Sequence, residues 1–399
     1  MVVLSVLVCL AATVLLLPTV SDAISLLRIA LGRGAARHQS RAELPRLLLL
    51  VPAHNEELLI DSCVRSLIAL DYPPARFSVV VIADNCTDRT ADLARAASAR
   101  CLERHDVEHP GKPRAVAWAL KQLPLGAYDA VVIVDADAVV DAQFATALAA
   151  AAPLTHKAVQ PYNDVRNPAE SAVTRLAAVF STARYRGSFV LKWRAGVNVP
   201  LSAGMCIGTA ILTEHGWDAF SIGEDWEWYA ILTALGIRID YAPGAHLYAQ
   251  EAKSLAQSAA QRQRWTAGKL TVLGRRGPQI LRNTQIGLHT KIDAIAELSA
   301  PGPVVHLGVV ALLGVLTQAL TLPLATVLIL ALTASVIRPA AYTIVGLRGD
   351  HHPMRAALAF AFLPIYAVWR LAVAVASLRM IGDRPWIRTR RHARNLGAR

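Results

Sequence analysis

The strongest constraint on the fold is the segment Val131–Val134 together with the two acids that follow it. Its four consecutive β-branched residues predict a strand buried on both faces, because the run is too short for a helix and too apolar for a sheet edge. Asp135 and Asp137 come directly after this strand. Acids at the carboxyl end of a buried strand lie where open α/β sheets bind ligands, and such a pair suits a divalent cation held against a diphosphate. Taken alone, the pair fits a solvated strand end better than a metal site.

Two earlier predicted strands also end in polar turns. Residues 47–51 lead into Pro52–Glu57, and residues 78–82 lead into Asp84–Asp88. An amphipathic helix is predicted after each turn, and a third helix, over 115–123, before the strand at Val131. Repeated strand–helix units of this length predict an α/β fold with a parallel sheet and helices on both faces. Because parallel strands end at one edge, the three turns together predict a nucleotide crevice.

The composition predicts a membrane protein. Hydrophobic residues make up 54% of the chain and the mean hydropathy is +0.38, which is high for a soluble protein. Residues 2–20 are uncharged, and basic residues follow them. This pattern predicts a signal anchor whose N-terminus lies outside, so that the next domain is cytoplasmic. The net charge of +12 comes largely from arginines beside apolar segments, which favours membrane flanks over nucleic-acid binding.

Two further features limit the class of protein. The five cysteines include no C-x-x-C pair, which disfavours a disulfide framework or a zinc site and indicates a reducing compartment. The chain contains neither G-x-G-x-x-G nor G-x-x-x-x-G-K-[ST], which counts against dinucleotide and P-loop enzymes.

The C-terminal third is apolar again. Val304–Leu320 and Leu322–Val336 are predicted to be two spans. Residues 356–378 contain Arg370 in mid-segment, a costly charge at bilayer depth, and are predicted to form an interfacial helix. This arrangement places the basic tail Arg384–Arg399 in the cytoplasm.

Two polar motifs lie between the predicted sheet and these segments. Gly223–Trp228 (GEDWEW) carries an acid pair at a predicted helix start, where the helix dipole alone also favours acids. Gln261–Trp265 (QRQRW) lies in a basic amphipathic stretch that also suits a helix lying on lipid head groups.

The five motifs together resemble glycosyltransferase family 2. The turns at 52–57 and 84–88, the D-x-D at 135–137, the acid pair at 224–225 and Q-x-x-R-W at 261–265 occur in the order and spacing of that family. The resemblance covers roughly residues 45–270. It is strongest to membrane-embedded members such as cellulose, hyaluronan and poly-N-acetylglucosamine synthases and ceramide glucosyltransferases. It implies a GT-A (Rossmann-like) domain, a nucleotide-sugar donor, usually a UDP-sugar, and Mg²⁺ or Mn²⁺.

The resemblance also implies roles for single residues. Ala53, Glu56 and Asp84 would line the uridine pocket, Asp135 would contact the nucleotide, and Asp137 would ligate the metal. Asp225 would be the general base. The donor and acceptor ends of the site would be cradled by Gln261, Arg264 and Trp265. Lys112 lies where relatives carry a lysine near the diphosphate, although Pro113 replaces a flexible position there.

This chemistry is physically coherent. Displacing a nucleoside diphosphate develops negative charge on the leaving group, which a metal at Asp137 and the cation of Arg264 would neutralise. Asp225 would take the acceptor proton, and a one-step displacement would invert the anomeric centre. Few membrane segments and no visible gating loop favour a lipid-linked or short saccharide acceptor over a long translocated polymer. A processive polysaccharide synthase stays open, since processive enzymes carry Q-x-x-R-W.

Two other classes are weaker alternatives. An inactive nucleotide-sugar-binding scaffold would be free to lose Asp137, Asp225 and Arg264, which are all present. A transporter would place its polar motifs in broken membrane helices and not in the soluble middle. The expected protein is therefore a multi-pass enzyme of the cell (inner or plasma) membrane. The sequence does not identify the sugar, the acceptor or the need for a partner subunit.

These expectations divide the chain into five parts. They are an N-terminal anchor (1–32), the GT-A domain (45–250), the Q-x-x-R-W segment with interfacial helices (251–300), C-terminal transmembrane or interfacial helices (301–381) and a basic tail (382–399).

Overall fold

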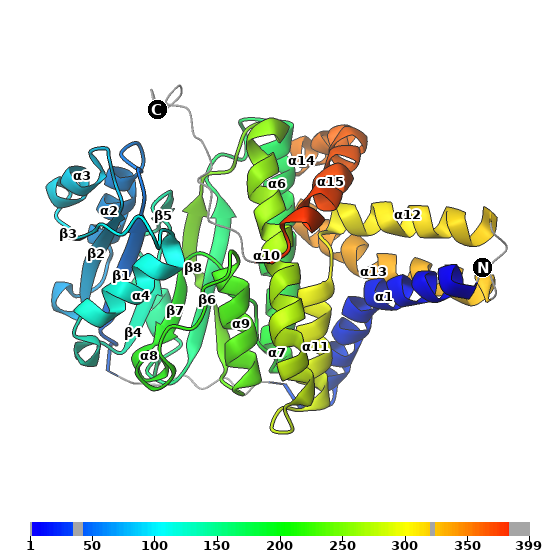
Figure 1. Cartoon of the computed structure of the whole chain (residues 1–399), viewed down its shortest axis with the longest axis horizontal. Coiled ribbons are helices and arrows are strands. Elements are labelled where there is room, and N and C mark those ends of the chain that lie inside the picture. The colour runs from blue at the N-terminus through cyan, green and yellow to red at the C-terminus, as the bar shows by residue number, and fades with distance from the viewer. Residues whose placement is uncertain (1, 35–42, 320–323, 383–399) are drawn as a thin grey trace.

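The computed structural model describes residues 2–34, 43–319 and 324–382. Its centre is an eight-stranded mixed sheet of order β3-β2-β1-β4-β7-β6-β8-β5 (Figure 1). The strands are β1 Leu47–Ala53, β2 Phe77–Asp84, β3 Arg100–Arg104, β4 Ala130–Ile133, β5 Ala138–Val140, β6 Ala158–Val165, β7 Met205–Gly208 and β8 Ile239–Ala249. The basic tail expected at Arg384–Arg399 and the residues 320–323 lie outside the described part.

One half of the sheet is parallel, as the sequence predicts. β1 pairs in parallel with β2 and with β4, and β2 pairs in parallel with β3. Ala53 lies opposite Ala83, and Leu50 lies opposite Ile133, so these strands end at one edge. β3 was not predicted, because its sequence RCLER has no apolar run and reads as polar surface.

Helices cover both faces of the sheet. Along β1, Leu48 and Leu50 pack into one core and Leu47 and Leu49 into the other, and all four are fully buried. Burying a leucine contributes about 1.5–3 kcal/mol to the free energy of unfolding, so this strand anchors both layers. The second core contains α2 Ile60–Ile68, α3 Thr90–Ala96 and α5 Phe144–Ala149. The first contains α4 Lys112–Gln122, α7 Phe189–Ala195, α8 Thr209–His215, α9 Glu224–Ala234, α10 Leu255–Arg282 and α11 Leu288–Ser299.

The other half of the sheet is mixed and brings distant segments to the D-x-D motif. β7 is antiparallel to β4 and to β6, whereas β8 is parallel to β6. β5 begins directly after Asp137 and pairs antiparallel with β8, so that Ala138 lies opposite Ala249. Asp135 and Asp137 therefore lie in the link between two strands and not at a free strand end.

Apolar helices extend from the sheet domain. α1 Val2–Ala30, α12 Pro303–Ala319 and α13 Ala325–Gly349 pack against one another and project together away from the sheet (Figure 1). α14 Pro353–Ala359 and α15 Leu363–Ser377 pack nearer the sheet domain, against α6 Ala172–Thr182 and α10 respectively. Between α6 and α7 lies a π-helical turn, Ala183–Ser188.

Three helices of the described part are long and apolar enough to cross a membrane: Val3–Ala30, Ala325–Gly349 and Pro353–Met380. α11 and α12 meet the same criterion only as a pair bent by 86°. The sequence predicted two C-terminal spans followed by an interfacial helix over 356–378. In the structure the helical stretch Pro353–Met380 includes Arg370 and still has the length and mean hydropathy of a span.

Ionic contacts lie where the apolar helices pack against one another and against α7 and α11. Lys192 of α7 donates to Asp293 of α11, and its ammonium lies 3.4 Å from the carboxylate of Glu297. Asp22 of α1 accepts from Arg338 of α13 at 2.9 Å. Because a buried charge is stable only when it is paired, these contacts specify how α1, α7, α11 and α13 meet.

Candidate active site

The turns after β1 and β2 meet at the carboxyl edge of the sheet and are linked by hydrogen bonds. The Thr87 amide donates to Oδ1 of Asn55 at 2.7 Å, and the Glu56 amide donates to Oγ1 of Thr90 at 2.8 Å. Asn55 has a φ of 55°, a left-handed conformation that asparagine tolerates. Ala53, the last residue of β1, is 4% exposed. The structure therefore places Ala53 and Glu56, two predicted site residues, in the hydrogen-bonded turns that follow β1 and β2.

Asp84 ends β2 with both carboxylate oxygens engaged. Its Oδ1 accepts from Nη1 of Arg104 at 2.6 Å, and its Oδ2 accepts from the Gly111 amide at 3.2 Å. The side chains of Asp84 and Arg104 are 5% and 6% exposed. Because each oxygen accepts from a different donor, the carboxylate of Asp84 is fixed in one orientation. Sequence reasoning missed Arg104, since no local pattern marks an arginine at the end of an unrecognised strand.

Lys112 joins the D-x-D motif to the acid pair of α9. It is the first residue of α4, after Gly111, whose φ of 112° favours glycine. Its Nζ lies 2.6 Å from Oδ1 of Asp135 and 2.9 Å from Oε1 of Glu224. Burial lowers the pKa of Lys112, but Asp135 and Glu224 raise it further, so the net pKa lies above its usual range and the group is a cation. Three motifs far apart in sequence therefore share one charge cluster.

Asp225 has the environment of a general base. Burial raises its pKa to about 7, helped by the charge of Glu224 and opposed by Lys112 and the Trp226 amide. That amide donates to Oδ1 of Asp225 at 2.8 Å. A carboxylate with a pKa near neutrality can accept a proton in the transition state and release it afterwards. Sequence reasoning assigned no role to Glu224, whose charge acts on both Lys112 and Asp225.

The Q-x-x-R-W motif lies on α10, which packs against the start of α9. The two helices approach so closely that a Cβ on Gly268 would lie 3.0 Å from the Gly223 nitrogen. Gln261, Arg264 and Trp265 are spaced by three and four residues and share one face of α10. Gln261 and Arg264 are half-buried, and Trp265 is 44% exposed.

A salt bridge ties α10 to the strand beside the D-x-D motif. Nη2 of Arg262 donates to Glu251 at 2.8 Å, and Glu251 follows Ala249, the partner of Ala138. The motif helix is thus anchored close to the segment that carries Asp137.

Two further basic side chains flank Trp226, the residue after the candidate base. Nζ of Lys269 lies 4.7 Å from the ring centroid of Trp226, and the guanidinium carbon of Arg184 lies 5.0 Å from it. Burial lowers the pKa of Lys269 to about 7, opposed by Glu297. Arg184 belongs to the π-helical turn, a local feature found often at functional sites. No sequence motif marked either residue.

The candidate metal site has few protein ligands. The described residues contain no group of three or more His, Cys, Asp or Glu side chains arranged for a metal ion. Asp137 is half-buried beside Asp135. Mg²⁺ is commonly held by one or two carboxylates together with substrate phosphates, so this donor set fits a cation that binds with the diphosphate.

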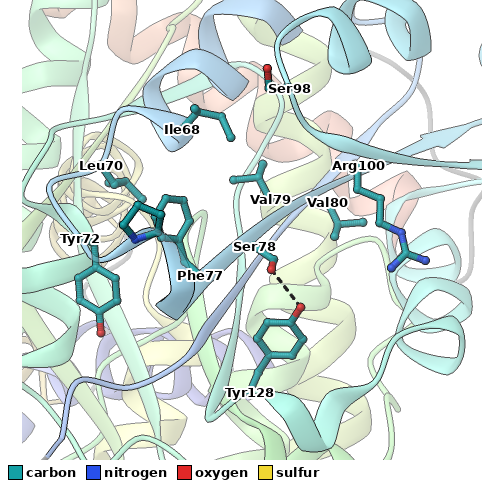
Figure 2. A pocket seen from close by; sticks show the side chains of 11 residues that line it. Ile68, Leu70, Tyr72, Phe77, Ser78, Val79, Val80, Ser98, Arg100 and Tyr128 are labelled. Carbon is teal, nitrogen blue, oxygen red and sulfur yellow. Dashed lines mark hydrogen bonds between the residues drawn. The ribbon is translucent and has the colours of Figure 1, made fainter.

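A cavity of about 520 Å³ lies at the other edge of the sheet (Figure 2). Its walls include Phe77 and Val79 near the start of β2, Arg100 at the start of β3, and Tyr128 before β4. The hydroxyl of Tyr128 donates to Ser78 across it at 3.1 Å. Because these residues lie at the amino ends of the strands, the cavity is separate from the predicted site.

Comparison with known proteins gives a family match over the sheet domain. A family model described as "Glycosyltransferase like family 2" matches residues 45–268. The probable glycosyltransferase YdaM of Bacillus subtilis (strain 168) is 26% identical over 249 residues, which cover 59% of this chain and 58% of that protein. A beta-monoglucosyldiacylglycerol synthase of Trichormus variabilis is 33% identical over 105 residues, which cover 25% of this chain and 22% of that protein. The chain thus spans less than two thirds of the length of either relative.

Among solved structures, the mannosyltransferase PcManGT from Pyrobaculum calidifontis, in complex with GDP-Man and Mn²⁺, superposes with a TM-score of 0.55. The sequences are 18% identical, and the match covers 94% of this chain and 96% of that one. This likeness confirms the predicted GT-A fold.

Proposed function

The chain belongs to glycosyltransferase family 2, and we propose that it is a membrane-bound, inverting enzyme. It would move a sugar from a nucleotide-diphosphate sugar, a UDP-sugar by its motifs, to a lipid acceptor at the cytoplasmic face. The observation that carries this proposal is the contact of Lys112 with both Asp135 and Glu224. Through it, the nucleotide-binding edge of the sheet and the helix that carries the candidate base form a single site.

The donor would bind along the carboxyl edge of the parallel strands. Ala53, Glu56 and Asp84 would line the uridine pocket, and Asp135 would contact the nucleotide. Lys112 faces this edge as a half-buried cation, and such a group attracts a diphosphate. Arg264 would add a second cation from α10.

Asp137 would hold a Mg²⁺ or Mn²⁺ ion together with the diphosphate. Such an ion supplies charge neutralisation for the leaving diphosphate. The solved mannosyltransferase with the same fold is in complex with GDP-Man and Mn²⁺, which supports this proposal.

The proton transfer would fall to Asp225. With a pKa of about 7, this carboxylate can take the acceptor hydroxyl proton as the oxygen attacks the anomeric carbon. General-base help of this kind is worth about 10²–10⁴ in rate. Because the attack and the departure occur in one step on opposite sides of that carbon, an α-linked donor would give a β-linked product.

The acceptor is proposed to be a lipid because apolar helices adjoin the site. α10, which carries Q-x-x-R-W, packs against α15, part of a helix long enough to cross a membrane. The beta-monoglucosyldiacylglycerol synthase that is partly similar to this chain is named for a glycolipid product, which also supports a lipid acceptor.

The proposal is tested with the full chain reconstituted in lipid and supplied with a panel of radiolabelled UDP- and GDP-sugars plus Mn²⁺. We expect label from a UDP-sugar to partition into organic solvent as a glycolipid. If the label is retained as high polymer instead, the lipid acceptor is refuted and the enzyme is a processive polysaccharide synthase. Absence of transfer from every donor, with membrane lipids present, would contradict the proposal.

A second test addresses the base. We expect Asp225→Asn to lower kcat by about 10²–10⁴ while Mn²⁺-dependent UDP binding persists. Glu214→Gln, at an exposed position on α8, serves as the control and keeps full activity. Full activity of Asp225→Asn would refute the assignment.

A further inference from the structure

Trp226 connects the candidate base to a distant arginine. It follows Asp225 in the first turn of α9, where main-chain N–H groups have no acceptor within the helix. The N–H of Trp226 donates instead to Oδ1 of Asp225 at 2.8 Å. The orientation of the carboxylate of Asp225 therefore depends on where the main chain of Trp226 lies, and the packing of the Trp226 side chain sets that position.

The guanidinium of Arg184 lies between two aromatic rings. Its central carbon is 5.0 Å from the ring centroid of Trp226 and 5.0 Å from that of Phe189. Trp226 is 8% exposed and Phe189 is fully buried. A cation over an aromatic face is attracted by the electron density of the ring, and more strongly where little water reaches it. Because the charge of arginine does not depend on pH, Arg184 holds the Trp226 ring under all assay conditions.

Hydrogen bonds do not account for this placement of Arg184. Its Nε is buried and has no hydrogen-bond partner among the described residues. Its Nη2 lies 4.0 Å from Oε1 of Glu297, which is longer than a hydrogen bond. A guanidinium that only stabilised the packing would use its buried N–H groups, since an unpaired one is unfavourable. The unpaired N–H is tolerated where the guanidinium covers the residue after the candidate base.

The π-helical turn Ala183–Ser188 fixes the main chain that carries Arg184. The hydroxyl of Tyr241, on β8, donates to the carbonyl oxygen of Tyr185 at 2.9 Å. On the other side, a Cβ built on Gly187 would lie 2.5 Å from a tyrosine ring of α13, so the turn and that helix are in close contact. The turn is thus held between the sheet and α13, and a functional side chain on such a support keeps a defined position.

From these contacts we infer that Arg184 is a positioning residue for sugar transfer: it holds the Trp226 ring, and the Trp226 amide in turn orients the carboxylate of Asp225. This inference rests on the proposed role of Asp225 as the base. It adds to that role a residue that touches neither the base nor the diphosphate-binding motifs and that no sequence motif marks.

The first test weakens the ring contact without changing shape or formal charge. Trp226 is replaced site-specifically by tryptophan analogues with one, two or three ring fluorines, which withdraw electron density from the ring face. The full chain is assayed in lipid with Mn²⁺ and the labelled UDP- or GDP-sugar that the parent accepts. We expect kcat to fall stepwise, by about tenfold in total, while KM for the donor stays constant. Activity that does not depend on the number of fluorines would overturn the inference.

The pH profile of the same series separates positioning from a general loss of structure. The Trp226 amide lowers the pKa of Asp225, so displacing it should raise that pKa and move the acid limb of kcat/KM to higher pH. Because fluorine adds no formal charge, this movement reports the amide and not a change in the field around the base. A fall in kcat with the acid limb unmoved would assign the contact a structural role only and would contradict the inference.

The second test changes Arg184 itself. Arg184→Met removes the charge but keeps a long side chain, and it should lower kcat about tenfold. Arg184→Lys returns a cation to the ring and should recover most of that loss. Arg194→Met, at an exposed position on α7, is the matched control and should act like the parent. Full kcat in Arg184→Met, or no recovery in Arg184→Lys, would argue against a cation that positions the ring.

Fluorine NMR distinguishes failure of this inference from failure of the proposed function. A single fluorinated analogue in place of Trp226 reports the surroundings of the ring in the full chain without donor or acceptor. We expect one narrow resonance in the parent and a shifted or broadened one in Arg184→Met, with Arg194→Met like the parent. Absence of sugar transfer by the parent would refute the proposed function, whereas a resonance that Arg184→Met leaves unchanged would refute the inference at any activity.

Discussion

Replacing Lys112 by glutamine tests whether the charge cluster sets the pKa of the candidate base. Lys112 is held by Asp135 at 2.6 Å and Glu224 at 2.9 Å, and its positive charge lowers the pKa of Asp225. Lys112 contacts Glu224, the residue before Asp225, and not Asp225 itself. At an effective dielectric constant of about 20, Coulomb's law gives about 4 kcal/mol for unit charges about 4 Å apart and about 2 kcal/mol at twice that separation, the value taken for this pair. This energy corresponds to about 1.5 pKa units. Removing the cation should therefore raise the pKa of Asp225 by that amount.

The expected readout is the acid limb of the pH profile. Because Asp225 acts as a base, activity requires its deprotonated form, so kcat/KM should rise with pH through the pKa. The kcat/KM for the donor reports groups of the free enzyme, and the parent limb is expected at about 7. In Lys112→Gln the limb should move about 1.5 units towards alkaline pH. Lys112→Arg should keep it near the parent value.

The design separates this shift from a lost phosphate contact. Loss of a contact with the diphosphate lowers kcat/KM at every pH without moving the limb. Lys121→Gln, at an exposed position near the other end of the same helix, should leave both unchanged. A limb of Lys112→Gln that stays in place, or moves to lower pH, would refute the electrostatic coupling between Lys112 and Asp225.

Three further predictions concern the metal, the domain junction and the helix contact. Asp137→Ala should abolish Mn²⁺-dependent UDP binding measured by calorimetry, and equal affinity with and without chelator would contradict the metal role. Lys192→Met leaves the carboxylate of Asp293 buried without its partner, so the free energy of unfolding should fall by about 3–5 kcal/mol. A double variant with Asp293→Leu should recover much of this loss, and thermal unfolding in detergent is the measurement. Gly268→Ala places a Cβ against the backbone of the segment before α9 and should lower kcat about tenfold or more, because the base is displaced. A Cβ built on Gly274 would meet no atom within 4 Å, so Gly274→Ala should leave kcat unchanged.

The parallel half of the sheet was predictable because its strands are buried on both faces. A run such as 131–134 has no other stable environment in a soluble domain, and the polar residues after it mark where it ends. β3 lacks that signature, since Cys101 and Leu102 are only half-buried between the exposed Arg100 and Glu103, and its one buried residue is Arg104. β6 and β8 were not predicted either. Their pairing joins residues 158–165 to 239–249, a non-local contact that no short-range pattern encodes.

The residues of the candidate site also fall into those that a local sequence pattern marks and those that it does not. Motif order predicted roles for Asp137, Asp225 and Trp265, because each lies in a local residue pattern that indicates its chemistry. The partners that set their behaviour were not identified, since Arg104 reaches Asp84 from another strand and Glu224 reaches Lys112 across the fold. Sequence therefore predicted which groups could react, while the pKa of the base depends on packing that only the structure describes.

The charge count of the cluster explains why donor binding should need a divalent cation. Without donor, Lys112 is already engaged by Asp135 and Glu224, and the carboxylate of Asp225 is destabilised by burial and by Glu224. A diphosphate brings further negative charge into this partly buried space. If Lys112 turns towards the diphosphate, the carboxylate of Asp135 or of Glu224 is less well neutralised. Each such change would raise the pKa of Asp225 above neutrality and so lower the fraction of Asp225 that is deprotonated when the acceptor needs a base. A cation held by Asp137 would offset the added charge, so a metal requirement and the pKa of the candidate base would be two consequences of one electrostatic balance.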